Sequence, residues 1–306
     1  MKNSCAFTAL LTLIVLPGAA PAWDDEGHMI VAALAYDRLD SSVRARADAL
    51  VRMNAQYQSW TGGVATASQG KVAFMKAATW PDYIKTAPGY KNDKDPTGPD
   101  AARNIGYGDH LQHRYWHYKD LPLSQDGTPT KNPTEPNAQT QIDAFRAVLA
   151  DPNASDALKS FDLVWLLHLV GDVHQPLHAA SRFAKATPHG DEGGNLVCLG
   201  PTMKGRCPTL HAFWDDILGT SKRPTAAMAS AKKLSLPAGA PDLSTANWLE
   251  ESEQIALARV YIKPILGGKG PYKVTKAYRT MARAAARERV VLAGARLAAI
   301  LNQELK

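Results

Sequence analysis

The chain has 306 residues, of which 35 are Lys or Arg and 29 are Asp or Glu. After the first 22 residues, no stretch approaches the roughly 20 apolar residues of a membrane-spanning helix, so we expect no membrane anchor in the mature protein. The modest excess of positive charge suits a polyanionic partner, although many exported proteins are also mildly basic.

The first 22 residues predict a secretory signal peptide. Lys2 precedes an apolar run over residues 9–16, and small residues follow as far as Ala22. Cleavage after Ala22 makes Trp23 the mature N-terminus and leaves 284 residues (306 − 22). Loss of Lys2 leaves 34 basic and 29 acidic residues, a net charge of about +5. We therefore expect an exported protein, either secreted or periplasmic.

Two cysteines remain after processing, because Cys5 leaves with the signal peptide. In an oxidising compartment, Cys198 and Cys207 would close a short loop as one disulfide bond; the alternative is a pair of free thiols. Zinc coordination by these thiolates is disfavoured, since no second pair of Cys or His residues lies at short spacing.

The spacing of apolar residues predicts one all-α domain over residues 23–306. Helices are expected over 26–39, 43–53, 71–80, 138–150, 155–174, 211–218, 248–262 and 273–304. Pro81 should stop the third helix, and residues 111–118 look extended or buried. Segments 86–109, 121–136 and 187–208 are predicted loops, rich in Gly, Pro, Asn and Asp. The arginines of the last helix are expected to form a solvated face, with a track for nucleic acid as the alternative: Arg279, Arg283, Arg287 and Arg289.

The segment 166–180, LLHLVGDVHQPLHAA, predicts a helix that binds metal. His168 and Asp172 are four residues apart, so both side chains leave the same helix face, one turn apart. Pro176 should break the helix and point His178 in another direction. An unpaired Asp172 in so apolar a helix would cost roughly 2 to 5 kcal/mol unless a cation or a donor met it. The alternative is a buried helix whose histidines are satisfied by hydrogen bonds.

Further metal ligands are predicted elsewhere along the chain. His211 and Asp215 form a second pair at a spacing of four, Asp82 follows Trp-Pro, and His117 lies within Trp-His-Tyr. Nitrogen and carboxylate ligands without thiolates favour zinc over manganese or iron. The set is too large for one tetrahedral ion, so a cluster of two or three zinc ions is expected. Such clusters catalyse phosphoryl chemistry.

Six motifs stand in order along the mature chain: Trp23 with Gly27-His28, ATWPD, WHY, HLVGDVHQPLH, DEGGN and LHAFWD. In these motifs the sequence resembles the S1/P1 zinc-dependent nucleases over essentially the whole mature chain. The resemblance implies a mainly helical fold of the phospholipase C/P1 nuclease type around three zinc ions.

Carried over by position, the resemblance also implies a ligand set for each zinc ion. The first would be held by Asp82, His117, His168 and Asp172. The second would be held by His178, His211 and Asp215. The third would be held by His28, by Asp172 as a bridge, and by the amino group and carbonyl of Trp23. Because this amino group exists only after cleavage, the untrimmed protein should lack the third zinc.

The resemblance further implies roles in catalysis and substrate binding. Asp172 would orient the attacking nucleophile, and Lys85 falls where the family often has an arginine aimed at the phosphoryl group. Tyr118 would stack on a base, Asp120 would hydrogen-bond the base edge, and Asn195 would lie near the phosphate. The implied substrates are single-stranded DNA, single-stranded RNA and 3′-mononucleotides, with 5′-phosphate products. We expect a monomer.

Two other functions stay open at this point. A bacterial zinc phospholipase C would share the fold and the N-terminal Trp. Its last ligand pair would end in Glu rather than Asp215, and its first-helix histidine would lie further from Trp23 than His28 does. A secreted zinc-binding protein without activity would need neither Lys85 nor Tyr118.

The remaining histidines have weaker signals. His110 and His113 are interpreted as loop or structural residues. His174, six residues after His168, is expected to hold a metal ligand in position.

Overall fold

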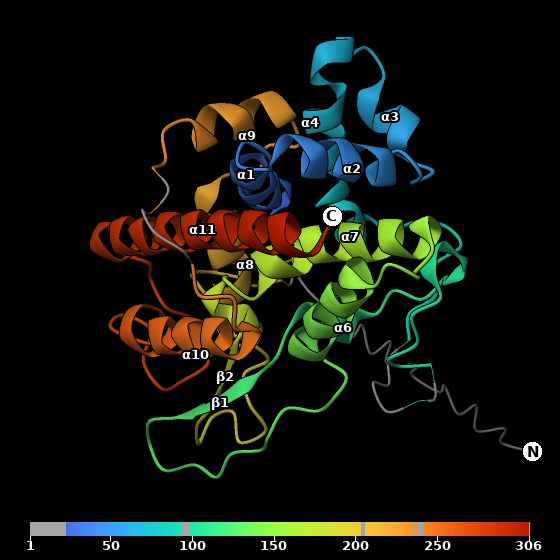
Figure 1. Ribbon diagram of the computed structural model, residues 1–306. Helices are drawn as coiled ribbons and strands as arrows, with labels where there is room; N and C mark the ends of the chain where they lie inside the picture. Colours follow the sequence, from blue (N-terminus) through green and yellow to red (C-terminus); the bar gives the residue numbers. More distant parts are fainter. Residues whose placement is uncertain are drawn as a thin grey trace, which may run out of the picture.

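The computed structural model describes residues 23–93, 98, 100–202, 206–235, 237 and 241–305; the predicted signal peptide lies outside them. The described residues form eleven α-helices and two short strands, which confirms the predicted all-α class (Figure 1). Strands β1 (Leu121–Ser124) and β2 (Ala180–Phe183) pair in parallel, with Leu121 opposite Ala180. No described helix combines the length and the apolar character needed to cross a membrane.

Helix α7 (Asp156–Asp172) lies at the centre of the fold. The Ser155 hydroxyl accepts a hydrogen bond from Leu158 N and caps the helix, and every residue from 159 to 172 is buried. A helix buried on all sides needs partners all round. Helices α6 (Ala138–Ala150), α1 (Asp25–Tyr36), α2 (Ser41–Val51) and α11 (Lys276–Glu304) all contact it. Helix α7 ends at Asp172, and Pro176 begins a short 3₁₀ turn, Pro176–His178.

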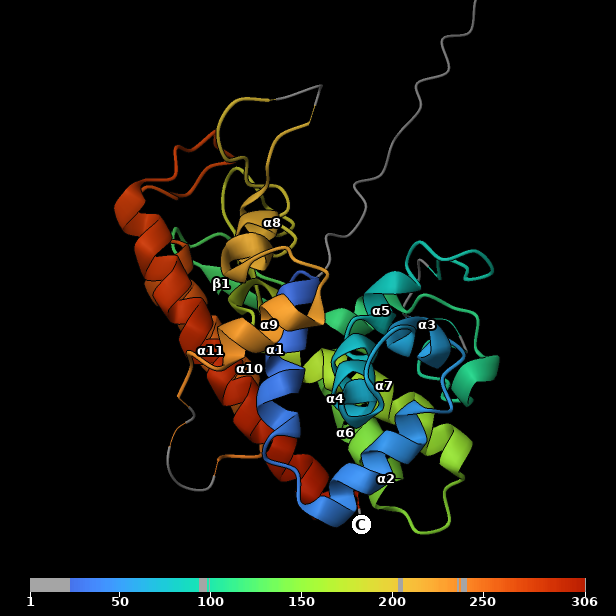
Figure 2. The ribbon, with the colours of Figure 1, turned by 90° about the horizontal axis from the view of Figure 1, so that it is seen from above.

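Helices α1 and α11 pack closely along their length, with α9 (Pro224–Ala231) also against α1 (Figure 2). Gly294 of α11 permits this approach, because a Cβ at that position would lie only 2.7 Å from the Cβ of Leu34. This contact holds the end of α1 close against α11.

The remaining helices complete the frame around α7. They are α3 (Tyr57–Thr61), α4 (Thr66–Ala77), α5 (Trp80–Tyr83), α8 (Leu210–Asp215) and α10 (Thr245–Ile255). Helix α10 continues into a π-helical turn, Ala256–Val260. Helices α3 and α9 were not predicted, since each is too short to show a clear apolar period.

The predicted helix boundary at Pro81 is wrong. Pro81 does not end a helix at Trp80: α4 ends at Ala77, and Pro81 lies in the first turn of α5, where a missing N–H costs nothing. Residues 111–118 were predicted to be extended or buried, and most of them are buried, with Arg114–His117 in a 3₁₀ turn.

The expected arginine face of α11 is correct at three positions and wrong at the fourth. Arg279, Arg283 and Arg287 are exposed, whereas Arg289 is buried. Its Nη1 atom lies 2.9 Å from Oε2 of Glu251, because α10 covers this side of α11. The disulfide prediction is confirmed: Cys198 and Cys207 are bonded, with their Cα atoms 5.6 Å apart.

Candidate metal centre

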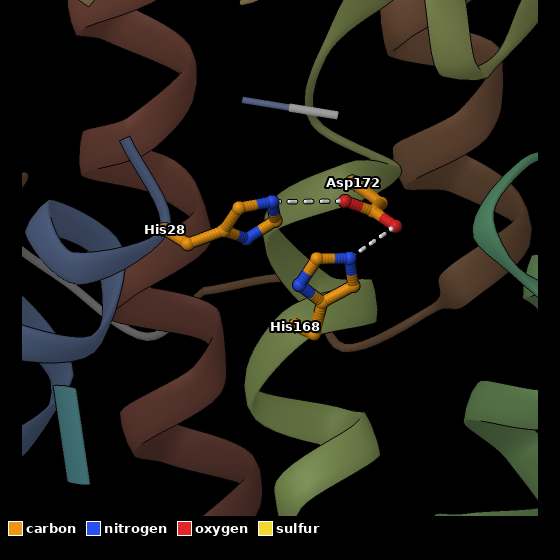
Figure 3. Close-up of side chains that lie close together, drawn as sticks. All are labelled: His28, His168 and Asp172. Carbon is orange, nitrogen blue, oxygen red and sulfur yellow. Dashed lines mark ion pairs between the residues drawn. The ribbon is translucent and has the colours of Figure 1, made fainter. Parts of the chain in front are cut away.

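The side chains of His28 and His168 converge on Asp172 (Figure 3). Nε2 of His28 lies 3.3 Å from Oδ1 of Asp172, and Nε2 of His168 lies 3.2 Å from Oδ2. The first residue comes from the first turn of α1 and the other two from the end of α7. The predicted spacing of four thus places His168 and Asp172 side by side, and the α1–α7 packing adds His28.

A second group shares His168 with the first. Nδ1 of His117 lies 2.9 Å from Nε2 of His168 and 3.0 Å from Oδ2 of Asp172. Oδ1 of Asp82 lies 3.8 Å from His117 Nδ1 and 3.7 Å from His168 Nε2. The structure therefore brings together all four residues predicted to hold the first zinc ion.

A third group forms where the 3₁₀ turn Pro176–His178 meets α8. The ligand atoms of His178, His211 and Asp215 all lie within 4.8 Å of one another. Nε2 of His211 lies 3.5 Å from Oδ2 of Asp215, as expected for residues four apart on a helix. These are the residues predicted for the second zinc ion.

Trp23 lies beside the group that contains His28. Its buried indole donates a hydrogen bond to Gly171 O at 3.0 Å. Gly171 allows this arrangement, because a Cβ there would lie 2.9 Å from Nδ1 of His28. Coordination by the amino group and carbonyl of Trp23 stays a prediction.

The histidines of the centre are oriented by backbone carbonyls. In each of three cases Nδ1–H donates to a carbonyl oxygen: His168 to Ala78 at 2.7 Å, His178 to His117 at 2.8 Å, and His211 to Gly193 at 2.7 Å. This bond fixes the tautomer, so the lone pair is on Nε2 and faces the centre.

Several buried atoms that face the centre have no hydrogen-bond partner among the described residues. They are Nε2 of His28, His178 and His211, Oδ1 of Asp172 and Oδ2 of Asp215. Each unsatisfied buried atom costs about 1–3 kcal/mol, and a bound cation would remove that cost. Nitrogen and oxygen atoms from His and Asp are ligands that zinc accepts. The residues therefore fit zinc.

Burial sets the protonation of these groups. Burial lowers the pKa of His28 to about 3, and those of His168 and His211 to about 4, so the three imidazoles are neutral at pH 7. Burial also raises the pKa of Asp172 and Asp215 well above the usual range. A cation would replace the proton that each carboxyl otherwise keeps.

Two features that position ligands were not found from the sequence. Nε2 of Gln175 donates to Oδ1 of Asp215 at 2.7 Å, which leaves Oδ2 facing the centre. In the DEGGN motif, Gly193 has φ +59°, and a side chain there would collide with the carbonyl of Leu177. The two adjacent glycines of DEGGN could have predicted this close approach to Leu177. Nothing in the sequence could have predicted that Gln175 contacts Asp215.

Lys85 contacts a predicted metal ligand, and two of the residues predicted to bind substrate line one cavity. Nζ of Lys85 is buried 2.6 Å from Oδ1 of Asp82, and this cation lowers the pKa of Asp82 despite its burial. Tyr118 and Asp120 line a cavity of about 200 Å³ together with Asn132. Burial, with Asp191 and Glu192 nearby, raises the pKa of Asp120 to about 7.

Asn195 is not brought into the cavity beside Tyr118 and Asp120. Its amide donates instead to Glu192 O at 2.9 Å. This local bond within the DEGGN turn keeps the side chain near its own backbone.

His113 makes the structural contacts expected of it. Its ring nitrogens lie 2.9 Å from Asp93 and 3.0 Å from Asp109, and the ring stacks on Trp116 at 3.6 Å. These contacts hold the segment that carries His117.

The expectation for His174 is wrong. Its Nδ1–H donates to Val170 O, and its Nε2 lies 2.8 Å from Nη1 of Arg296. The residue lies beyond the end of α7, where its ring packs against Trp248 of α10 instead of a metal ligand.

The structure defines a class of protein: a mainly helical fold that brings together three groups of His and Asp, each of which could hold a metal ion. Residues 23–306 match the family model described as S1/P1 Nuclease, and the chain belongs to this family. The resemblance predicted from the six motifs is thereby confirmed.

Two curated relatives carry nuclease names. The chain is similar to "Endonuclease 4" of Arabidopsis thaliana, with 26% identity over 223 residues, which cover 69% of this chain and 60% of that protein. It is also similar to "Nuclease S1" of Aspergillus oryzae, with 37% identity over 68 residues, which cover 22% of this chain and 20% of that protein. The aligned regions thus span less than two thirds of either relative.

Proposed function

We propose that this protein is a zinc-dependent endonuclease that cleaves single-stranded DNA and RNA to 5′-phosphate products and also hydrolyses 3′-mononucleotides. We further propose three zinc ions per chain and a monomer that is exported, to the periplasm or the medium, after cleavage at Ala22. The observation that carries the proposal is the convergence of three His and Asp groups around buried, unpaired ligand atoms in a member of this family.

Zinc, when bound, would supply the positive charge that activates water and stabilises the oxygens of a phosphodiester under attack. The residues of the chain would hold and orient the reactants. Asp172 lies between two of the groups, so its carboxylate is placed to accept a hydrogen bond from the attacking water. Lys85 would add a point charge beside the phosphoryl group, without the bidentate contact of an arginine.

The cavity beside the centre supports a nucleotide substrate. The ring of Tyr118 is 37% exposed, so one face can stack on an unpaired base. Asp120 lines the same cavity, where its carboxyl can hydrogen-bond the edge of that base. Stacking contributes about 1–3 kcal/mol per base and tolerates any sequence, and a duplex hides the base faces. We therefore expect single strands to be preferred.

The test compares substrates with the purified, correctly trimmed protein. Single-stranded DNA, RNA, 3′-AMP and a phosphatidylcholine emulsion are each assayed with and without EDTA, and zinc is counted by elemental analysis. We expect EDTA-sensitive hydrolysis of the first three and about three zinc ions. Hydrolysis of the lipid alone would indicate a phospholipase C, and full zinc content without any hydrolysis would indicate a zinc-binding protein.

A further inference from the structure

A second cavity, of about 540 Å³, opens beside Asp82. It shares no lining residue with the cavity of Tyr118 and Asp120. Helices α3, α4 and α5, which lie together on one side of α7 in Figure 2, contribute six of its fourteen lining residues. We call it the α3–α5 cleft and define it by Trp60, Lys76, Asp82, Tyr83, Lys85 and Lys222.

The α3–α5 cleft holds positive charge that is not used by the fold. Four cationic side chains line it, against three carboxylates: Lys76, Lys85, Arg114 and Lys222, with Asp24, Asp25 and Asp82. Lys85 is paired with Asp82, and Nζ of Lys76 donates to the carbonyl of Lys222 at 2.7 Å. Lys222 itself is exposed and forms no ion pair with any described residue. Its ammonium is therefore free to meet an anion.

Aromatic side chains stand beside this charge. Tyr83 of α5 is 47% exposed, and Trp60 of α3 is half-buried in the same wall. A large exposed tyrosine next to the half-buried Asp82, a predicted ligand, has no packing role that explains it. Lysines next to aromatic faces are the combination that binds single-stranded nucleic acid, since the cations meet phosphates and the rings meet bases.

We infer that the α3–α5 cleft binds the part of a single strand that continues past the cleaved phosphodiester. In this arrangement Lys222 contacts a phosphate that is not cleaved, and Tyr83 stacks on a base. The inference rests on the proposed nuclease function. Asp82 borders the cleft, and Tyr118 follows His117, so the two cavities flank the same metal centre and can receive the bases on either side of the reacting phosphate.

The test measures kcat and KM of the zinc-loaded protein on two substrates. Octathymidylate has phosphates on both sides of a cleavage point, whereas the dinucleotide TpT has only the phosphate that is cleaved. Lys222→Ala should raise KM for octathymidylate roughly two- to fivefold and leave TpT unchanged. It should also reduce the dependence of log KM on log salt by about 0.7, the value for one phosphate contact on a single strand.

Variants of Tyr83 separate stacking from charge. Tyr83→Ala should raise KM for octathymidylate roughly fivefold or more, and Tyr83→Phe should restore the original value because the ring is retained. Lys233→Ala removes an equally exposed lysine that does not line the cleft, and it should change nothing.

Equal behaviour of Lys222→Ala and Lys233→Ala on octathymidylate, with an active original protein, would overturn the inference and leave the proposed function standing. An original protein that cleaves neither substrate would contradict the proposed function and remove the basis of the inference.

Discussion

Asp172 is the residue on which the proposed centre depends most, because its two oxygens face different histidines. Asp172→Asn keeps the volume of the side chain but removes its charge. Loss of a residue that only hydrogen-bonds to a metal ligand typically lowers activity about 10- to 100-fold, so loss of the ligand itself should lower activity more than about 100-fold. Zinc content should fall as well. Asp156→Asn, at the solvent-exposed start of the same helix, is the matched control. Normal turnover of single-stranded DNA by Asp172→Asn would refute the metal centre as proposed.

Gln175 gives a second prediction at this scale. Gln175→Ala removes the hydrogen bond to Asp215, so zinc affinity at the group of His178, His211 and Asp215 should fall roughly 10- to 100-fold. Chelator competition at increasing strength measures this. The control is Gln69→Ala on α4, which also removes a side-chain hydrogen bond, from Gln69 to Val64 O, but outside the three groups. The Gln175 variant should lose one ion at a lower chelator strength than the Gln69 variant does. Loss of every ion at the same chelator strength in both variants would show that Gln175 does not position Asp215.

At the scale of helices, α1, which carries His28 in its first turn, packs closely against α11. Gly294→Ala places a methyl group 2.7 Å from the Cβ of Leu34, so the free energy of unfolding should fall by about 1–3 kcal/mol despite the better helix propensity of alanine. Ala284→Ser, on the exposed side of α11, should stay within about 0.5 kcal/mol. Urea unfolding of the zinc-loaded variants gives both values, and a more stable Gly294→Ala would show that the helices can separate.

The predictions from the sequence are correct where they depend on the spacing of residues within one helix. Pairs at a spacing of four, such as His211 and Asp215, needed only the helical period, and α6 was predicted with both ends correct. Contacts between distant segments were missed. Arg289 is buried because α10 covers it, and His174 lies between Arg296 of α11 and Trp248 of α10. No period along one helix reports which other helix will cover it.

At the scale of the whole molecule, zinc should link stability to pH. Burial raises the pKa of Asp172 and of Asp215 in the metal-free fold. In the unfolded chain both carboxyls have the ordinary pKa of 3.8. Above pH 3.8 the unfolded chain therefore releases these protons while the metal-free fold keeps them. The metal-free fold therefore loses stability as the pH rises above 3.8, and zinc, which displaces these protons, cancels the loss. The histidines of the centre are neutral in the metal-free fold and in the zinc-loaded fold, so they do not change the difference in stability between these two forms.

The difference in Tm between zinc-loaded and EDTA-treated protein should consequently be larger at pH 7.5 than at pH 5.5. Thermal unfolding at both pH values, at constant free zinc and ionic strength, measures it. A difference that shrinks as the pH rises would mean that the carboxyls do not release protons to the metal.

Processing of the chain gives the last prediction, since it decides whether the amino group of Trp23 exists. The indole of Trp23 is buried beside Gly171 and His28, next to the proposed metal centre. A protein with one extra alanine before Trp23 has an amide in place of the amine and should hold about two zinc ions instead of three. Elemental analysis of both forms, after removal of loosely bound metal, gives the count. Because His178, His211 and Asp215 come from other segments, their zinc should be unaffected. Equal zinc content in both forms would exclude the amine as a ligand.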